Sequence, residues 1–215
     1  MEIVTMIDGG FLRKKYHAAL KENISALQIK NFVNNIIKYS GFERTSAYRV
    51  YFYDCRPCDA KTTFPVSNKA LNLAKTVQYD ESLKLINDIR SLDFFAFREG
   101  QLSFSGWKLK KKCYKETPYT DESFDLDLAQ KGVDIKIGLD IAWISYNNVS
   151  ERILLVTGDS DFIPAIKTAR RNGILVHLFT LGHHVKDDLK LNADVCIENS
   201  LADFIAAVPY PAHGS

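Results

Sequence analysis

One stretch of the sequence decides the fold class: Ile153-Leu154-Leu155-Val156-Thr157-Gly158-Asp159-Ser160-Asp161-Phe162. Four apolar residues in a row predict a short strand that is buried on both faces, as strands of parallel sheets are. Ligands of open α/β sheets bind outside the carboxyl ends of such strands. Because Gly158 permits a sharp turn at this point, we expect Asp159 and Asp161 to reach the crevice beyond the strand.

These two acids have two interpretations. Carboxylates held close together repel each other unless a cation lies between them, and hard oxygen donors suit Mg²⁺ or Mn²⁺. Alternatively, Asp159 and Ser160 cap a helix, which the apolar spacing predicts over residues 161–171, before Gly173. Capping needs only one of the two acids, so this stretch alone leaves both interpretations open.

Further acids follow other apolar segments. The chain opens with a strand pattern that is closed by Asp8, Gly9 and Gly10, and a helical pattern then runs to Leu20. Residues 130–143 predict a helix that is buried on most of its circumference. In that helix Asp134 shares a face with Gly138, four residues further on, so a metal or a phosphate has room to approach.

Asp140 is a weaker candidate in the same predicted helix. It lies six residues after Asp134, about 240° around the helix axis, so the two side chains need not serve one site. A pairing with Lys136, four residues earlier, explains Asp140 as well as a metal role does.

Strand and helix patterns alternate along the rest of the chain. Strand patterns cover residues 47–53, 174–179 and 195–197, and helical patterns cover 27–39 and 68–90. Residues 94–104 predict a hairpin with its turn at Glu99-Gly100, whereas 55–67 and 119–130 are expected to be loops. Strands separated by helices imply parallel βαβ units with right-handed crossovers.

Three motifs in this order resemble the NYN domains of the PIN-like nuclease superfamily, in particular its LabA-like branch. They are Ile7-Asp8-Gly9-Gly10-Phe11, Lys131-Gly132-Val133-Asp134 and Gly158-Asp159-Ser160-Asp161-Phe162. Residues 97–102, Gly106-Trp107 and 189–194 extend the resemblance over most of the chain. Many relatives carry Asn shortly after the first aspartate, where this chain has Gly9 and Gly10.

The resemblance implies a three-layer α/β/α sandwich with a mainly parallel, Rossmann-like central sheet and a hairpin elaboration. It also implies a metal-dependent endoribonuclease that binds Mg²⁺ or Mn²⁺ and cleaves RNA. By match of motif, the catalytic and metal-binding acids are Asp8, Asp134, Asp159 and Asp161.

Length and composition agree with one domain. The chain has 215 residues, 46% of them hydrophobic, enough to bury a sizeable core. We expect one domain over residues 1–207, with an insertion at about 55–130 and a tail at 208–215. With no apolar run long enough to span a bilayer and no leader pattern at the N-terminus, the expected location is the cytoplasm.

A formal net charge of +2 means that RNA binding must rest on local clusters of charge. Residues 107–115 gather five lysines and two aromatic residues. Lys110, Lys111 and Lys112 suit phosphates, and Trp107 suits stacking on unpaired bases, so the expected partner is RNA with single-stranded segments. The alternative is an edge strand that lysines protect from aggregation.

Several residues beyond these clusters have open roles. Arg13 and Lys131 are candidates for holding a phosphate, or are simply surface charges. Asp54, at a predicted strand end, either approaches the acids or, the favoured interpretation, makes a turn or cap. The other open residues are His183 and His184, at the cleft or on the surface, and four cysteines, expected to be reduced thiols rather than zinc ligands: Cys55, Cys58, Cys113 and Cys196.

Two other function classes compete with the nuclease. A haloacid-dehalogenase-type phosphatase also ends its first strand in aspartate, but it needs a second aspartate where this chain has Gly10. A non-catalytic RNA- or protein-binding regulator on the same scaffold, or a homo-oligomer, is also compatible with the sequence, because a fold does not fix a function.

Overall fold

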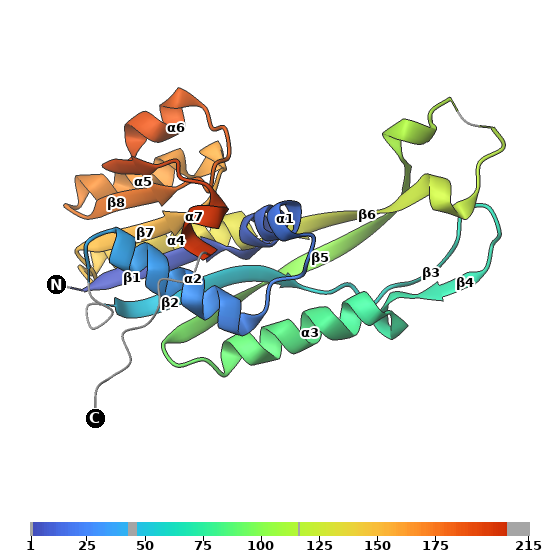
Figure 1. Ribbon diagram of the computed structural model, residues 1–215, viewed down its shortest axis with the longest axis horizontal. Helices are drawn as coiled ribbons and strands as arrows, with labels where there is room; N and C mark the ends of the chain where they lie inside the picture. The colour runs from blue at the N-terminus through green and yellow to red at the C-terminus, as the bar shows by residue number, and fades with distance from the viewer. Residues whose placement is uncertain (1, 43–46, 116, 206–215) are drawn as a thin grey trace.

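A seven-stranded sheet with helices on both faces forms the body of the protein (Figure 1). The computed structural model describes residues 2–42, 47–115 and 117–205, so the expected tail at 208–215 lies outside the described residues. The strands of the main sheet are β1 (Ile3–Asp8), β2 (Ala47–Arg56), β5 (Phe95–Leu109), β6 (Phe124–Lys131), β7 (Arg152–Val156), β8 (Leu175–Phe179) and β9 (Val195–Ile197). The helices are α1 (Gly9–Leu20), α2 (Ala26–Tyr39), α3 (Val77–Arg90), α4 (Val133–Tyr146), α5 (Ile163–Arg171), α6 (Asp187–Asn192) and α7 (Leu201–Ile205).

The sheet is parallel except at one edge. Its order is β6-β5-β2-β1-β7-β8-β9, and only the β5–β6 pair is antiparallel. The central strands β1 and β7 are almost wholly buried, as their unbroken apolar runs predict. The predicted α/β fold with a mainly parallel sheet is therefore confirmed.

Two separate apolar cores hold the layers together. On one face of the sheet, side chains of α1, α2 and α7 pack with Ile3, Ile7 and Phe52. On the other face, side chains of α4, α5 and α6 pack with Val4 and Met6. Alternate residues of β1 thus point into opposite cores, which is how one strand supports three layers.

The order in which strands are added to the sheet reverses at β1. From β1 the chain proceeds to β2, β5 and β6 on one side, and it returns to β7, β8 and β9 on the other. Residue Ile7 is paired with Val156, so the carboxyl ends of β1 and β7 lie side by side. This is the topological switch point, where open α/β sheets bind ligands.

The antiparallel pair β5–β6 forms an arm that extends away from the rest of the sheet, with α3 running alongside β5 (Figure 1). The predicted hairpin turn at Glu99-Gly100 is wrong, because β5 runs unbroken through both residues. A Cβ at Gly100 would lie 2.6 Å from the Val133 side chain and 2.9 Å from the Cys55 sulfur. Close packing, and not a turn, therefore requires the glycine.

The predicted loop over residues 119–130 is also wrong, since most of it is strand β6. The acids that suggested a solvated loop lie across from the lysines of β5. Lys108 pairs with Asp127 at 3.6 Å, and Lys110 pairs with Asp125 at 3.5 Å. Opposite charges on facing strands stabilise a pairing that composition alone conceals. Because β6 covers β5, the edge strand is β6 and not residues 107–115.

The segment before α3 also differs from expectation. A helix was predicted from residue 68, but α3 begins at Val77, after the short antiparallel pair β3 (Lys61–Thr63) and β4 (Ala70–Asn72) and the 3-10 turn η2 (Leu73–Lys75). Trp107 fixes this pair to the arm by donating its indole N–H to the carbonyl of Thr63 at 3.0 Å. Within the described ranges, no helix is long and apolar enough to cross a membrane.

Candidate active site

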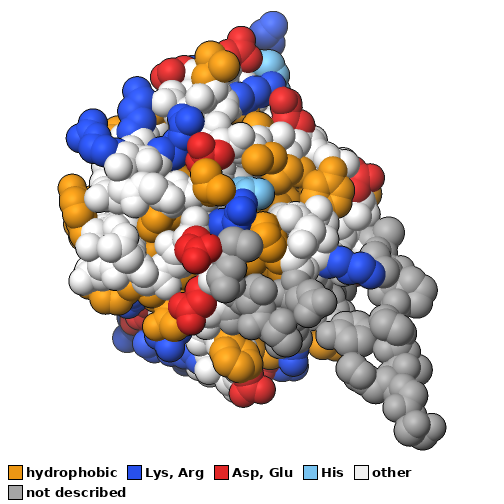
Figure 2. All heavy atoms as spheres, turned by 90° about the vertical axis from the view of Figure 1, so that its left-hand side faces the viewer, with side chains coloured by type: hydrophobic (Ala, Val, Ile, Leu, Met, Phe, Trp, Pro, Cys, Tyr) orange, Lys and Arg blue, Asp and Glu red, His pale blue; other side chains and the backbone are white. Residues whose placement is uncertain are grey.

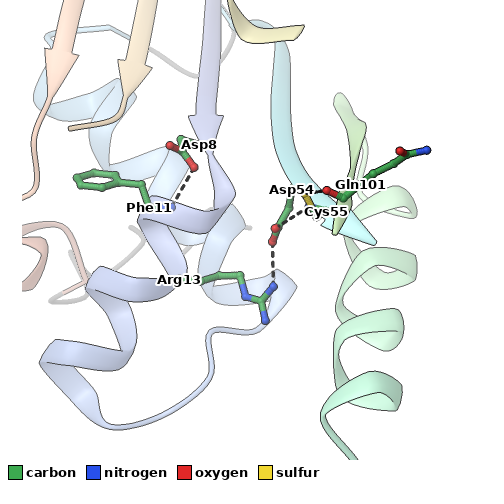
Figure 3. A network of polar contacts seen from close by, with 6 residues as sticks. All are labelled: Asp8, Phe11, Arg13, Asp54, Cys55 and Gln101. Carbon is green, nitrogen blue, oxygen red and sulfur yellow. Dashed lines mark hydrogen bonds and ion pairs between the residues drawn. The ribbon is translucent and has the colours of Figure 1, made fainter. Parts of the chain in front are cut away.

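Asp8 occupies the carboxyl end of β1 and caps helix α1. Its carboxylate accepts a hydrogen bond from the backbone N–H of Phe11 at 3.0 Å (Figure 3). The pKa of Asp8 is raised from 3.8 to about 6, chiefly by burial and further by the negative charges of Asp134 and Asp54. The Phe11 N–H and Lys14 lower that pKa but do not offset the burial. The site thus holds a carboxylate where its negative charge is unfavourable.

Asp54 is a buried acid beside Asp8. The sequence favoured a turn or cap for this residue, but it lies inside strand β2 and is only 4% exposed. Its carboxylate accepts a hydrogen bond from the Cys55 N–H at 2.7 Å and forms an ion pair with Arg13 at 3.0 Å (Figure 3). Asp54 is therefore a charged neighbour of the site that is already neutralised by its own arginine.

Asp134 is contributed by the first turn of α4. Gly132, with φ of +81°, lets the chain leave β6 and enter this helix. The pKa of Asp134 is raised by partial desolvation and then by the charges of Asp159 and Asp161. Three segments that are distant in the sequence thus bring their carboxylates within electrostatic range of one another.

Asp159 and Asp161 differ in their roles after β7. Asp159 caps the 3-10 turn η5 (Ser160–Phe162), because its carboxylate accepts the N–H of Asp161 at 2.9 Å. The capping interpretation of Asp159 therefore holds, and it does not remove the residue from the site, since Asp159 also lines the cavity described next. Asp161 is exposed and lies outside that lining, although its charge reaches Asp134.

An open cavity of about 710 Å³ lies at the switch point between β1 and β7. Acidic residues from three elements lie in its wall, and cationic and aromatic residues surround them. The lining residues are Asp8, Gly10, Phe11, Lys14, Lys15, Ala18, Gln130, Asp134, Gly158, Asp159, Ser160, His183, His184, Val185 and Lys186. This volume is ample for a nucleotide-sized ligand.

Phe11 and His183 form an aromatic wall of the cavity. Their ring centroids lie 5.8 Å apart at an interplanar angle of 63°. A Cβ at Gly158 would stand 2.5 Å from the His183 ring and 2.9 Å from the Phe11 ring. Gly158 is therefore needed for space at this wall. The sequence favoured a surface or capping role for His183 and His184, and both are exposed residues that line the cleft.

Basic residues that the sequence did not single out surround the acids. Lys14 and Lys15 lie on α1 and Lys186 precedes α6, and all three line the cavity. A signal for the α1 residues was present, because Phe11, Lys14, Lys15 and Ala18 recur at the spacing of one helix face. No local pattern could reveal Lys186, which reaches the cavity only through the fold.

The structure places Asp140 away from the other acids. Its carboxylate accepts the Tyr53 hydroxyl at 2.8 Å and an N–H of Arg98 at 3.0 Å, and it does not line the cavity. The pairing with Lys136 that the spacing suggested is wrong, because the Lys136 ammonium donates to the carbonyl of Glu99. Asp140 thus joins α4 to strands β2 and β5.

The basic residues expected to bind RNA also lie outside the cavity lining. Arg13 pairs with Asp54, and Lys131 is exposed at the end of β6. In the arm, Lys110 donates to the carbonyl of Glu122 at 2.7 Å, while Lys111 and Lys112 are exposed in the 3-10 turn η3 (Lys111–Cys113). Trp107 packs against the Phe64 ring, with centroids 5.5 Å apart.

Cys55, Cys58 and Cys196 are free thiols. Burial raises the pKa of Cys55 to about 11, so its thiol is a weak metal ligand at neutral pH. Within the part of the chain that is described, no three His, Cys, Asp or Glu side chains are gathered closely enough to hold a metal ion among themselves.

The surface at the far end from the arm has mixed character. Figure 2 shows acidic, basic and apolar side chains interspersed there, with no extended patch of one charge. A nucleic acid needs a basic surface of some extent. Among the described residues visible in Figure 2, basic side chains stand next to acidic ones, so they do not make a continuous basic surface.

Comparison with known proteins places this geometry in a family. The NYN domain matches residues 21–201 of the sequence. The chain belongs to the NYN domain family. The match includes Asp134, Asp159 and Asp161, whereas Asp8 precedes it. NYN domains are PIN-like ribonucleases, so the family that the three motifs indicated is confirmed.

One solved structure is similar to the NYN chain over its length. It is a protein of unknown function from Vibrio parahaemolyticus, 14% identical, with a TM-score of 0.49, and the alignment covers 91% of each chain. A comparison with curated proteins finds no match.

Replacing Asp140 by Ala should destabilise the protein by about 1–3 kcal/mol, because the buried Tyr53 hydroxyl loses its acceptor and Arg98 loses its partner. Asp140→Asn should lose less, since the amide still accepts a hydrogen bond. Urea unfolding measures both effects. If Asp140→Ala left stability unchanged and weakened the binding of divalent metal, Asp140 would be a metal ligand and not a structural residue.

Replacing Asp8 by Asn should stabilise the metal-free protein at high pH. The folded pKa of about 6 exceeds the ordinary 3.8, so the folded state binds its proton more tightly and stability falls as pH rises through this window. Asparagine caps a helix equally well and carries no charge. We expect a gain of about 1–3 kcal/mol at pH 8 and almost none at pH 4, measured by urea unfolding in EDTA. An equal gain at both pH values would contradict the electrostatic explanation.

Proposed function

We propose that this NYN domain is a metal-dependent endoribonuclease that cleaves single-stranded RNA in the cavity between β1 and β7. The observation that carries the proposal is one cavity whose wall includes Asp8, Asp134 and Asp159 together with Lys14, Lys15 and Lys186. The acids suit a cation, and the lysines suit the phosphates on either side of a cleaved bond.

The donor set fits a hard divalent cation. Burial raises the pKa of Asp8, and the charge of Asp134 raises it further. Desolvation raises the pKa of Asp134, followed by the charges of Asp159 and Asp161, and a cation among these acids would relieve the repulsion. Mg²⁺ is commonly held by only one or two carboxylates together with water, so a set of three converged acids is not required. Asp8 and Asp134 would hold Mg²⁺ or Mn²⁺, with Asp159 nearby.

A bound divalent ion would lower the pKa of a water molecule and stabilise charge on the phosphate oxygens. The side chains of the domain do the positioning. The Phe11 N–H fixes the Asp8 carboxylate at the end of β1, and the Asp161 N–H fixes that of Asp159. Both acids are therefore held by backbone and do not need to reorganise when substrate enters.

Binding of the RNA strand falls to the basic and aromatic residues of the cavity. Lys14 already lies close enough to Asp8 to lower its pKa, so a phosphate on this lysine would be next to the acids. The rings of Phe11 and His183 offer faces and edges on which an unpaired base can stack. These features favour single-stranded segments over a duplex.

Replacing Asp134 by Asn should reduce RNA cleavage by at least about 100-fold, which corresponds to several kcal/mol of lost transition-state stabilisation. RNA affinity should stay equal or rise, because one negative charge near the phosphates is lost. Cleavage of a fluorescent single-stranded RNA in Mn²⁺ and in EDTA provides the measurement.

The matched control is Asp88→Asn, which removes an exposed acid from α3, outside the cavity lining. This variant should cleave like the wild type. If Asp134→Asn cleaved RNA as fast as the control, the activity would belong to a contaminant, and the non-catalytic regulator would become the better description of the domain.

Two basic clusters can be compared directly as RNA-binding surfaces. Replacing Lys14, Lys15 and Lys186 with Ala should lower affinity for single-stranded RNA and flatten its salt dependence by up to about 0.7 per lost contact. The same change at residues 110–112 should have a smaller effect, because Lys110 is already bonded within the arm. Binding at several salt concentrations tests both. A larger effect at 110–112 would favour the arm as the RNA surface.

A further inference from the structure

Helix α4 has two apolar faces, and the described residues of the chain cover only one of them. Its inner residues Val133, Ile137, Ile141 and Ile144 pack on the sheet and are at most 3% exposed. The sequence predicted a helix buried on most of its circumference, and this prediction is wrong. A second set of large apolar residues points to solvent: Ile135, Leu139, Trp143 and Tyr146, which are 52–70% exposed.

These four residues, which we call the α4 stripe, form one continuous line. At 100° per residue they fall within a band about 80° wide, opposite the inner face, and they span about 16 Å along the helix. In the described ranges no other helix exposes more than two large apolar side chains. Scattered exposed apolar residues are ordinary, whereas a contiguous patch of this kind marks an interaction site.

The stripe carries no charge that would select a charged partner. The charged residues beside it are already engaged within the chain: Lys136 with the carbonyl of Glu99, and Asp140 with Arg98 and Tyr53. Gly138 flanks the stripe on the other side, and a Cβ there would meet nothing within 4 Å. A neighbouring backbone can therefore approach α4 closely on that flank.

We propose that the α4 stripe is a self-association face, through which two copies of this chain pack antiparallel about a two-fold axis. A two-fold axis near the middle of the stripe sets Ile135 of one copy against Tyr146 of the other, so the aliphatic end meets the aromatic end. The same patch thus serves both partners, which is the condition for a closed dimer.

The available area agrees with a second copy as the occupant. Four large side chains that are more than half exposed offer on the order of 500 Å² in each copy. Their complete burial in a pair would cover roughly 1,000 Å² before the flanks are counted, which is about the lower bound for a specific interface. The stripe residues do not line the cavity at the switch point. The existence of the dimer therefore does not depend on the proposed nuclease activity.

Sedimentation equilibrium of the full chain between about 1 and 100 µM tests the proposal, because this range covers the weak association that is typical of a small interface. We expect the wild type to shift from 24.4 kDa towards twice that mass. Leu139→Asp should stay monomeric, with the dissociation constant raised about 100-fold or more, because a carboxylate would be buried at the interface.

The matched control is Leu191→Asp, which changes another exposed leucine, on α6, and should dimerise like the wild type. A wild type that stays monomeric at every concentration would overturn the proposal and leave the stripe to a different protein. A dimer that survives Leu139→Asp, or one that Leu191→Asp abolishes, would also overturn it.

Fluorescence gives a second readout that needs no change in the stripe. The chain has two tryptophans, Trp107 and Trp143, so Trp107→Phe leaves Trp143 as the reporter. Burial of Trp143 between two copies should shift its emission to shorter wavelength as concentration rises through the same range. An emission maximum that stays constant while the mass doubles would place the interface elsewhere.

Discussion

The carboxylate of Asp8 is held where its negative charge is unfavourable, and much of the cavity is organised around that constraint. The carboxylate cannot move out to solvent without loss of local structure, because the side chain caps α1 and the backbone of Asp8 ends β1. β1 is also the strand at which the chain reverses across the sheet, so its position fixes both cores. The unfavourable charge of Asp8 is therefore fixed by the central strand of the sheet. Perturbed acids of this kind are common at functional sites.

Neutralisation is distributed unequally among the acids near Asp8. Asp54 is buried deepest and has Arg13 as a partner, whereas Asp8 has only a backbone N–H and the more distant Lys14. An arginine paired with Asp8 would neutralise the carboxylate permanently, and a cation would then gain little by binding there. The arrangement keeps one acid of the neighbouring pair satisfied and the other available.

The sequence predicted those features that arise from local order. Apolar runs ending in acid and glycine revealed β1 and β7, and with them Asp8 and Asp159. Features that depend on a distant partner were missed or mistaken. Gly100 was taken for a turn because its close neighbours Val133 and Cys55 lie far away in the sequence, and Asp54 was taken for a cap because Arg13 lies 41 residues earlier.

Helix α4 is a second case in which the sequence pattern does not identify the partner of a residue. Its sequence is apolar over most of the circumference, which normally predicts a helix enclosed by its own protein. The sheet encloses the face of Ile137 and Ile141, and no element of the described chain covers Leu139 and Trp143. An apolar pattern records that a face is to be buried, but not whether the same chain or another copy buries it. Because Asp134 occupies the first turn of this helix, a partner that steadies α4 also steadies a wall of the cavity.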